Sequence, residues 1–146
     1  MEAHHIKKKK TRIALVVASF DASITDVMTS SARNAIDEAH GRVGSFTQVT
    51  GAYEIPLAAK HALRNPLIDA VVALGWIEKG ETLHGEIMGY VVHEALIRLQ
   101  LEYDKPVGLG IIGPGATMLQ ARNRARDTAK RAVQAACLMN ALINSA

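Results

Sequence analysis

Four runs of mainly aliphatic residues alternate with segments of helical periodicity along this chain. The runs cover residues 12–19, 42–50, 68–76 and 105–113. Apolar residues at three- and four-residue spacing predict helices over 24–39, 57–63, 82–101 and from about 118 to 144, with a break near Arg126. Apolar strands that alternate with helices are typical of parallel sheets covered on both faces. The pattern therefore predicts an α/β domain with helices on both sides of one parallel sheet.

The composition agrees with a layered domain. Hydrophobic residues make up 49% of the chain but aromatic residues only 4%, so Val, Ile, Leu and Ala must build the core. Such a core favours a layered α/β architecture over an aromatic-rich β-sandwich. The chain is long enough to bury a core without disulfides and fits one domain. We expect that domain to span residues 12–146 and to follow a basic, flexible tail at residues 1–11.

The net charge of +3 comes from the N-terminus. Residues 1–12 contain five basic residues, the run KKKK and Arg12, against Glu2. Residues 13–146 therefore keep 12 of the 17 basic and 13 of the 14 acidic residues, a charge of −1. A near-neutral body does not indicate a nucleic-acid groove, so we predict no nucleic-acid partner. The lysine run is interpreted as a solvated tail rather than a polyanion-binding arm.

Cysteine usage and apolar run length favour a cytoplasmic protein. The single cysteine, Cys137, excludes an internal disulfide and lies in the apolar pattern AVQAACLMNALI. That context predicts a small buried side chain rather than a nucleophile. The uncharged apolar stretches are shorter than the ~20 residues that cross a bilayer, and the N-terminus is too charged for a signal peptide. We expect a reducing, cytoplasmic location and no membrane partner.

Each predicted strand ends in residues that local structure does not explain. Phe20 follows the first strand, GAYE (51–54) the second, GWIEKGETLH (75–84) the third and GPGAT (113–117) the fourth. The carboxyl ends of parallel strands share one edge of the sheet, where helix N-termini and loops commonly bind ligands. Four atypical loops at this edge predict a small-molecule site.

The stretch GLGIIG matches the dinucleotide-binding pattern G-x-G-x-x-G but lies in the wrong place. Gly108 and Gly110 fall inside the fourth predicted strand, whereas the fingerprint belongs to a turn that opens a helix. The first strand–helix turn, SFDAS, has no glycine. We therefore do not predict a dinucleotide cofactor. The two glycines indicate close packing or the close approach of a ligand ring.

His84 lies where the third strand is followed by a long helix. Gly80 allows a tight turn, Thr82 is the predicted N-cap, and the free amides around residues 81–83 would attract an anion. Helical spacing places His84 above Met88, Val91, Ala95 and Leu99 on the face predicted to point inward. Two interpretations stay open: a histidine that merely starts a helix, or a general acid–base beside an anion pocket. No Cys or His lies at zinc-like spacing, so no metal is predicted.

A second basic element lies in the last predicted helix, in LQARNRARDTAKRAV (119–133). Arg124 and Arg131 are seven residues apart and share a face of a continuous helix, whereas Lys130 lies about a third of a turn away. Asp127 could pair with Arg124. These arginines are either solvated surface charges or, at the sheet edge, bidentate ligands for a phosphate.

The chain resembles lumazine synthase over residues 12–143. Four motifs in register carry the resemblance: GAYEIP, GWIEKGETLH, LQARNR and the block YDKPVGLGIIGPGATMLQA. The last block looks like the archaeal branch of the family. The resemblance implies a three-layer α/β/α sandwich, flavodoxin-like, with a four-stranded parallel sheet. It also implies condensation of 5-amino-6-ribitylamino-uracil with 3,4-dihydroxy-2-butanone 4-phosphate to 6,7-dimethyl-8-ribityllumazine, phosphate and water. That reaction uses no redox cofactor and no metal.

The resemblance also implies a role for each matching residue. His84 would transfer protons, and Arg124 would act in catalysis and bind phosphate from the neighbouring subunit. The implied pyrimidine and ribityl contacts are Phe20, Gly51, Ala52, Tyr53, Glu54, the strand-end backbone of Trp76 and Ile77 and, from the neighbour, Leu109. The implied phosphate contacts are Gly80, Glu81, Thr82, Arg124 and one of Lys130 and Arg131, of which helical spacing favours Arg131.

Three positions depart from the usual family pattern: Thr50 replaces a proline, Lys79 an arginine, and Trp76 a much smaller residue. The bulk of Trp76 leaves the size of the pocket open. The family forms homopentamers, which in many members close into an icosahedral shell, and riboflavin synthase is a candidate partner. Two alternatives remain: an archaeal-type riboflavin synthase, which fits the intact GETLH and GAYEIP poorly, and a catalytically silent shell or binding protein of the same fold.

Overall fold

The computed structural model describes residues 9–145; residues 1–8, which hold most of the predicted tail, and residue 146 lie outside the described part. Four parallel strands form one sheet in the order β2-β1-β3-β4. They are β1 (Arg12–Ala18), β2 (Arg42–Val49), β3 (Ala70–Glu78) and β4 (Val107–Ala116). The helices are α1 (Ala22–Glu38), the 3-10 turn η1 (Ala52–Glu54), α2 (Ile55–Leu63), α3 (His84–Tyr103) and α4 (Met118–Asn144).

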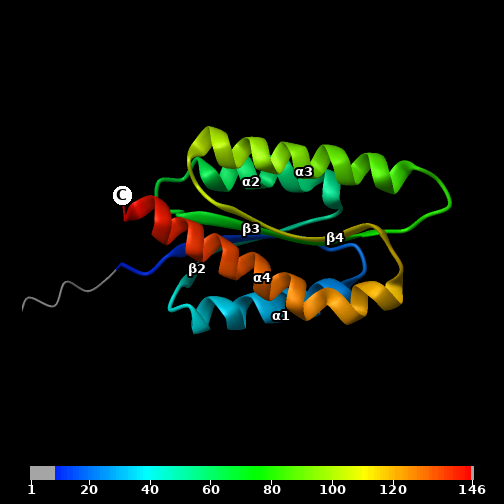
Figure 1. Cartoon of the computed structure of the whole chain (residues 1–146), viewed down its shortest axis with the longest axis horizontal. Helices are drawn as coiled ribbons and strands as arrows, with labels where there is room; N and C mark the ends of the chain where they lie inside the picture. The colour runs from blue at the N-terminus through cyan, green and yellow to red at the C-terminus, as the bar shows by residue number, and fades with distance from the viewer. Residues whose placement is uncertain (1–8, 146) are drawn as a thin grey trace, which may run out of the picture.

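Helices cover both faces of the sheet. Helices α1 and α4 lie on one face, and α2 and α3 lie on the other (Figure 1). The predicted three-layer α/β/α sandwich with a four-stranded parallel sheet is confirmed, and its strand order is that of flavodoxin-like folds. Among the described residues, no helix combines the length and apolarity needed to span a membrane.

Alternate residues of the strands feed two separate cores. Leu15, Val17 and Leu74 belong to the core shared with α1 and α4, whereas Val16, Val71 and Ala73 belong to the core shared with α2 and α3. This two-sided burial explains why β1 and β3 are continuously apolar. Strand β2 lies at an edge and is largely exposed, which explains its weaker apolar pattern.

Two predictions for the last strand and the last helix are wrong. Helix α4 runs unbroken from Met118 to Asn144, because buried alanines recur on its inner face on both sides of Arg126. Strand β4 continues beyond residue 113 to Ala116, where it pairs with Glu78 after an irregularity that spans Gly113, Pro114 and Gly115. The stretch that was expected to be a loop is therefore a distorted strand end.

Gly108 lets α4 lie directly on β4. A Cβ atom at Gly108 would lie 2.3 Å from the carbonyl oxygen of Ala132. The Ala132 oxygen belongs to the helix backbone and the new Cβ would be fixed to the strand backbone. The clash could therefore be relieved only by moving α4 and β4 apart. Of the two interpretations of the GLGIIG glycines, close packing is therefore the one that the structure supports at Gly108.

Substituting Gly108→Ala is expected to lower the free energy of unfolding by about 1–3 kcal/mol, because the new methyl group overpacks the β4–α4 contact. Denaturant unfolding followed by circular dichroism measures the change. Gly80→Ala is the matched control, since a Cβ there would lie 4.0 Å from the Thr82 amide nitrogen, an ordinary van der Waals distance. Equal stability losses in the two variants would show that the close contact is not limiting.

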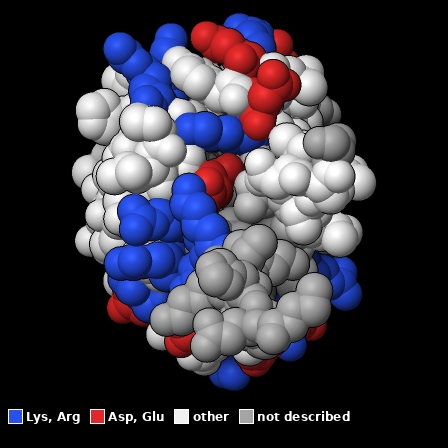
Figure 2. Space-filling model, turned by 90° about the vertical axis from the view of Figure 1, so that its left-hand side faces the viewer, with Lys and Arg blue, Asp and Glu red and all other residues white. Residues whose placement is uncertain are grey.

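The end of the molecule opposite to the strand carboxyl ends carries charges of both signs. Figure 2 views this end, with a group of basic side chains at the left and acidic side chains at the centre and the top. At this end the ammonium group of Lys105 donates hydrogen bonds to the carbonyl oxygens of Leu63 and Asn65, at 2.9 and 3.1 Å. It therefore caps the C-terminus of α2.

Candidate functional site

Residues that follow the four strands meet at one edge of the sheet, at the right of Figure 1. Two ring pairs join segments that are distant in sequence: Phe20 with Trp76, and Tyr53 with His84. Small-molecule sites of open α/β sheets occupy this edge. The residues predicted to converge here do so, and their roles stay predictions.

Phe20 presents an exposed ring directly after β1. Its side chain is 48% exposed, and the next residue, Asp21, is the N-cap of α1, with a positive φ of 53°. The Asp21 carboxylate accepts a hydrogen bond from the Ser23 amide at 3.1 Å, which fixes the turn. The Phe20 ring lies 5.8 Å from the Trp76 ring, at an interplanar angle of 43°. An exposed ring held in this way forms a platform on which a flat heterocycle can stack.

The side chain of Trp76 points into a core and does not project at the sheet edge. Its side chain is only 3% exposed and belongs to the core between the sheet and helices α1 and α4. The indole therefore fills core volume and leaves the sheet edge open. Ile77, the next residue, is also 3% exposed and points into the other core.

The segment after β2 forms the single turn η1. The Glu54 carboxylate closes this turn by accepting a hydrogen bond from the Gly51 amide at 3.0 Å. Ala52 is buried beneath the turn, whereas Tyr53 is 45% exposed. The Tyr53 ring meets the His84 ring edge-on, with centroids 5.9 Å apart and planes at 68°. The η1 turn therefore lies against the start of α3.

Helix α3 begins later than predicted, and its buried face is different. The N-cap is Leu83, not Thr82, and the Thr82 hydroxyl accepts a hydrogen bond from the His84 amide at 3.3 Å. The buried residues of α3 are Gly89, Val92, Leu96 and Leu99, so His84 is not on the inward face as predicted but is exposed at the sheet edge. Exposure leaves the imidazole accessible to a substrate.

The loop before α3 surrounds a shallow concavity of about 340 Å³. Gly80, Glu81 and Thr82 line it together, as the phosphate prediction requires. Within the described part of the chain, no bond is made by the amides of Gly85 and Glu86 in the first turn of α3, which leaves donors for an anion. The lining side chains include three glutamates and one lysine, a formal charge of −2. A phosphate bound here needs cations from outside this concavity.

Helix α4 carries the predicted arginines on exposed positions. Lys130 lies 3.7 Å from the Glu38 carboxylate of α1, so its ammonium group is turned toward that helix. Arg131 instead lines a groove along β4. Arg124 is exposed, and the described residues include no ion pair between it and Asp127. Of the three predicted cations of α4, Arg124 and Arg131 are therefore the two that do not turn toward α1 and that stay available to an anion.

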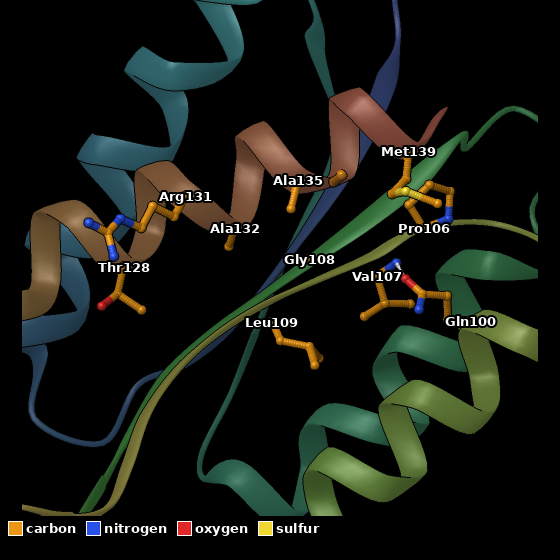
Figure 3. A pocket seen from close by; sticks show the side chains of 11 residues that line it. Gln100, Pro106, Val107, Gly108, Leu109, Thr128, Arg131, Ala132, Ala135 and Met139 are labelled. Carbon is orange, nitrogen blue, oxygen red and sulfur yellow. Dashed lines mark hydrogen bonds between the residues drawn. The ribbon is translucent and has the colours of Figure 1, made fainter. Parts of the chain in front are cut away.

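The groove along β4 is a second concavity, of about 460 Å³ (Figure 3). Its floor includes Gly108 and Leu109, and its sides include Arg131 and Thr128 from α4 and Gln100 from α3. The groove shares no lining residue with the concavity before α3. Leu109 and Arg131, which were predicted to serve one site with the GET loop, therefore line a different hollow of the same chain. Sequence reasoning missed Thr128 and Gln100, for which no local signal exists.

Two further kinds of reactive site come into question: a cysteine nucleophile and a metal centre. Cys137 is partly buried against the core of α1 and α4, and burial raises the pKa of its thiol, which disfavours a nucleophilic thiolate. Within residues 9–145, no three His, Cys, Asp or Glu side chains gather as metal ligands.

The fold is of the open α/β class, and its strand-end residues form a candidate small-molecule site. The family model described as 6,7-dimethyl-8-ribityllumazine synthase matches residues 10–144, and the chain belongs to this family. Similar proteins carry the same description. The one from Staphylothermus marinus is 42% identical over 128 residues, 88% of this chain and 85% of the relative. The one from Saccharolobus islandicus is 41% identical over 90% of this chain and 85% of the relative. The one from Metallosphaera sedula is 42% identical over 88% of this chain and 85% of the relative.

The family resemblance read from the four motifs is confirmed, including its archaeal character. The relatives are named as synthases of the transferase class, and the chain is accordingly an enzyme of riboflavin biosynthesis.

Proposed function

We propose that this chain condenses 5-amino-6-ribitylamino-uracil with 3,4-dihydroxy-2-butanone 4-phosphate to 6,7-dimethyl-8-ribityllumazine, phosphate and water. One observation carries the proposal. The family match spans residues 10–144, and within it the stacking residue Phe20, the turn at Tyr53 and the helix start at His84 meet at one sheet edge. The reaction needs a ring platform, a polyol clamp and a proton-transfer group, and these three elements supply them.

Each step of the condensation moves a proton. The pyrimidine amine attacks the ketone, water leaves the carbinolamine, phosphate is eliminated, and the ribitylamino nitrogen closes the ring on the second carbonyl with loss of a second water. The exposed imidazole of His84, beside Tyr53 and the GET loop, is the group suited to these transfers. Phe20 would hold the pyrimidine by stacking, and Gly51 to Glu54 would hold the ribityl chain. Holding both substrates together would supply much of the acceleration by proximity.

The site is proposed to form between two copies of the chain in a homopentamer. The concavity at Gly80, Glu81 and Thr82 has a formal side-chain charge of −2 and needs cations for a phosphate. Arg124, which is exposed, and Arg131, which lines the groove with Leu109, would supply these cations to the concavity of a neighbouring copy. Light scattering would distinguish a pentamer from an icosahedral assembly of pentamers.

Incubation of the purified chain with both substrates tests the proposed reaction. The expected result is lumazine and inorganic phosphate in equal amounts, with neither formed when one substrate is omitted. A riboflavin synthase would instead form riboflavin from lumazine alone. A silent shell protein would form no product, and the pyrimidine would not raise its melting temperature. Either of these outcomes would contradict the proposal.

Substituting Phe20→Ala is expected to raise KM for the pyrimidine about 5- to 150-fold, because stacking of a base on an aromatic side chain contributes about 1–3 kcal/mol. Phe46→Ala is the matched control. The chain has only two phenylalanines, and Phe46, at 43%, is almost as exposed as Phe20 but lies on the edge strand β2 beneath Arg33. Steady-state kinetics at saturating butanone phosphate measures both. An equal rise in the two variants would remove Phe20 from the pyrimidine site.

A further inference from the structure

Trp76 is the aromatic residue of the GWIEKGETLH motif, and the proposed reaction gives its indole no task. It is the only tryptophan of the chain, near the carboxyl end of β3. Val17 pairs with Leu74, so two residues further along both strands Trp76 lies beside the end of β1, from which Phe20 follows. The indole is thus placed next to the ring platform by strand register.

The indole nitrogen also reaches the other neighbouring strand. The Trp76 Nε1–H donates a buried hydrogen bond to the Ala116 carbonyl oxygen at 3.1 Å. The same oxygen accepts from the Lys79 amide at 2.9 Å. Ala116 is the last residue of β4, directly before Thr117, the N-cap of α4. One carbonyl therefore joins the end of β4 to the indole and to the start of the GET loop.

Backbone pairing between β3 and β4 is irregular at this point. Trp76 pairs with Ile112 and Glu78 with Ala116, so two residues on β3 span four residues on β4. A strand end with this irregularity lacks part of the regular backbone hydrogen bonding between neighbouring strands. The indole bond bridges the gap from the side of α1 and α4. On the opposite side Gly89 of α3 contacts Pro114, where an added Cβ would lie 2.4 Å from the proline Cδ.

Helix α4 leaves room for the indole. Its buried residues are almost all alanines, among them Ala121 and Ala125, which belong with Trp76 and Ala116 to one core cluster. A residue that only had to fill this space could be any large apolar side chain. The indole adds a donor that meets a buried acceptor and a ring that contacts Phe20.

From these contacts we propose that Trp76 is a positioning residue for the pyrimidine: its indole fixes the plane of the Phe20 ring and ties that ring to the last residue of β4. The inference rests on the proposed function, because it takes Phe20 as the platform for the pyrimidine. The indole of Trp76 is buried and would not touch the substrate, so the contact implied for this residue would come from its backbone. Its action passes through Phe20.

Fluorescence of the wild-type chain gives the first test. Trp76 is the only tryptophan, so the emission reports on this residue alone. Titration with 5-amino-6-ribitylamino-uracil, without the second substrate, is expected to change the emission. The change should disappear in Phe20→Ala and persist in Phe46→Ala. The inference would be overturned if saturating pyrimidine left the wild-type emission unchanged. It would also be overturned if the emission of Phe20→Ala changed as much as that of the wild type.

A double-mutant cycle gives the second test. Trp76→Leu is expected to raise KM for the pyrimidine about tenfold and to change kcat less than threefold, since the platform binds substrate and transition state alike. Trp76→Phe keeps a ring but loses the donor, and the Ala116 oxygen still accepts from Lys79, so an intermediate rise is expected. In the Phe20→Ala background, Trp76→Leu should add less than a further twofold.

A merely structural role predicts a different pattern. Trp76→Leu would then lower the melting temperature and the amount of active enzyme with KM unchanged, or its effect on KM would multiply with that of Phe20→Ala. Either result would overturn the inference. If Trp76→Leu does not fold, the cycle is run with Trp76→Phe and the same criteria. Failure of the wild-type chain to form lumazine would instead refute the proposed reaction, while the emission titration still reports whether the pyrimidine binds.

Discussion

Substituting His84→Ala is expected to lower kcat by about 10²- to 10⁴-fold, the usual contribution of a positioned general acid–base. The imidazole is exposed at the strand ends, edge-on to Tyr53, and follows the loop of Gly80 to Thr82. The side chain is not part of either core, so assembly and melting temperature should stay at wild-type values. Steady-state rates with both substrates saturating measure the change.

Chemical rescue separates proton transfer from binding. Removal of the side chain leaves an open space at an exposed position, so added imidazole should restore part of the lost kcat in His84→Ala. His61→Ala is the control, because His61 is exposed in the last turn of α2 and should show wild-type rates and no response to imidazole. A His84→Ala variant with wild-type kcat, or one that imidazole leaves unchanged, would argue against the proton-transfer role.

Substituting Arg124→Ala is expected to lower kcat/KM by about 10²- to 10³-fold, the typical cost of removing one preorganised donor from a developing anion. The concavity before α3 carries a formal charge of −2, so a phosphate there depends on imported cations. Arg124→Lys keeps the charge but loses the bidentate geometry and should show an intermediate loss. The butanone phosphate is varied while the pyrimidine is held saturating.

Arg122→Ala is the matched control for Arg124→Ala. Both arginines are exposed on α4, and two residues of separation turn them to different sides of the helix. The control should keep at least half of the wild-type kcat/KM. If both variants lose activity equally, general attraction of the phosphate by positive charge explains the effect, and the specific role of Arg124 is wrong.

The layered fold was predictable because its signals are local. Continuous apolar runs at β1 and β3 require burial on both faces, and parallel strands bring their carboxyl ends to one edge. The edge strand β2 gave a weaker signal because most of its residues are exposed. The four motifs that followed the strands then identified the family without any knowledge of packing.

The errors arose where contacts between distant segments decide the structure. The start of α3 moved from Thr82 to His84, because the Thr82 hydroxyl bonds the His84 amide from outside the helix. Gly89 must face Pro114, and this contact sets which side of α3 is buried. The hydrogen bond of the Trp76 indole depends on an acceptor at Ala116, forty residues further along the chain. Helical periodicity carries no information about such partners.

Subunit mixing tests the shared, catalytic site most directly. His84→Ala and Arg124→Ala are each nearly inactive, but an interface between one copy of each variant can pair an intact His84 with an intact Arg124. Co-assembly at equal amounts should therefore restore roughly a quarter of the wild-type rate of lumazine formation, because each interface draws its two members at random. Mixed assemblies that stay at the average rate of the two separate variants would show that the site does not combine these residues across two copies.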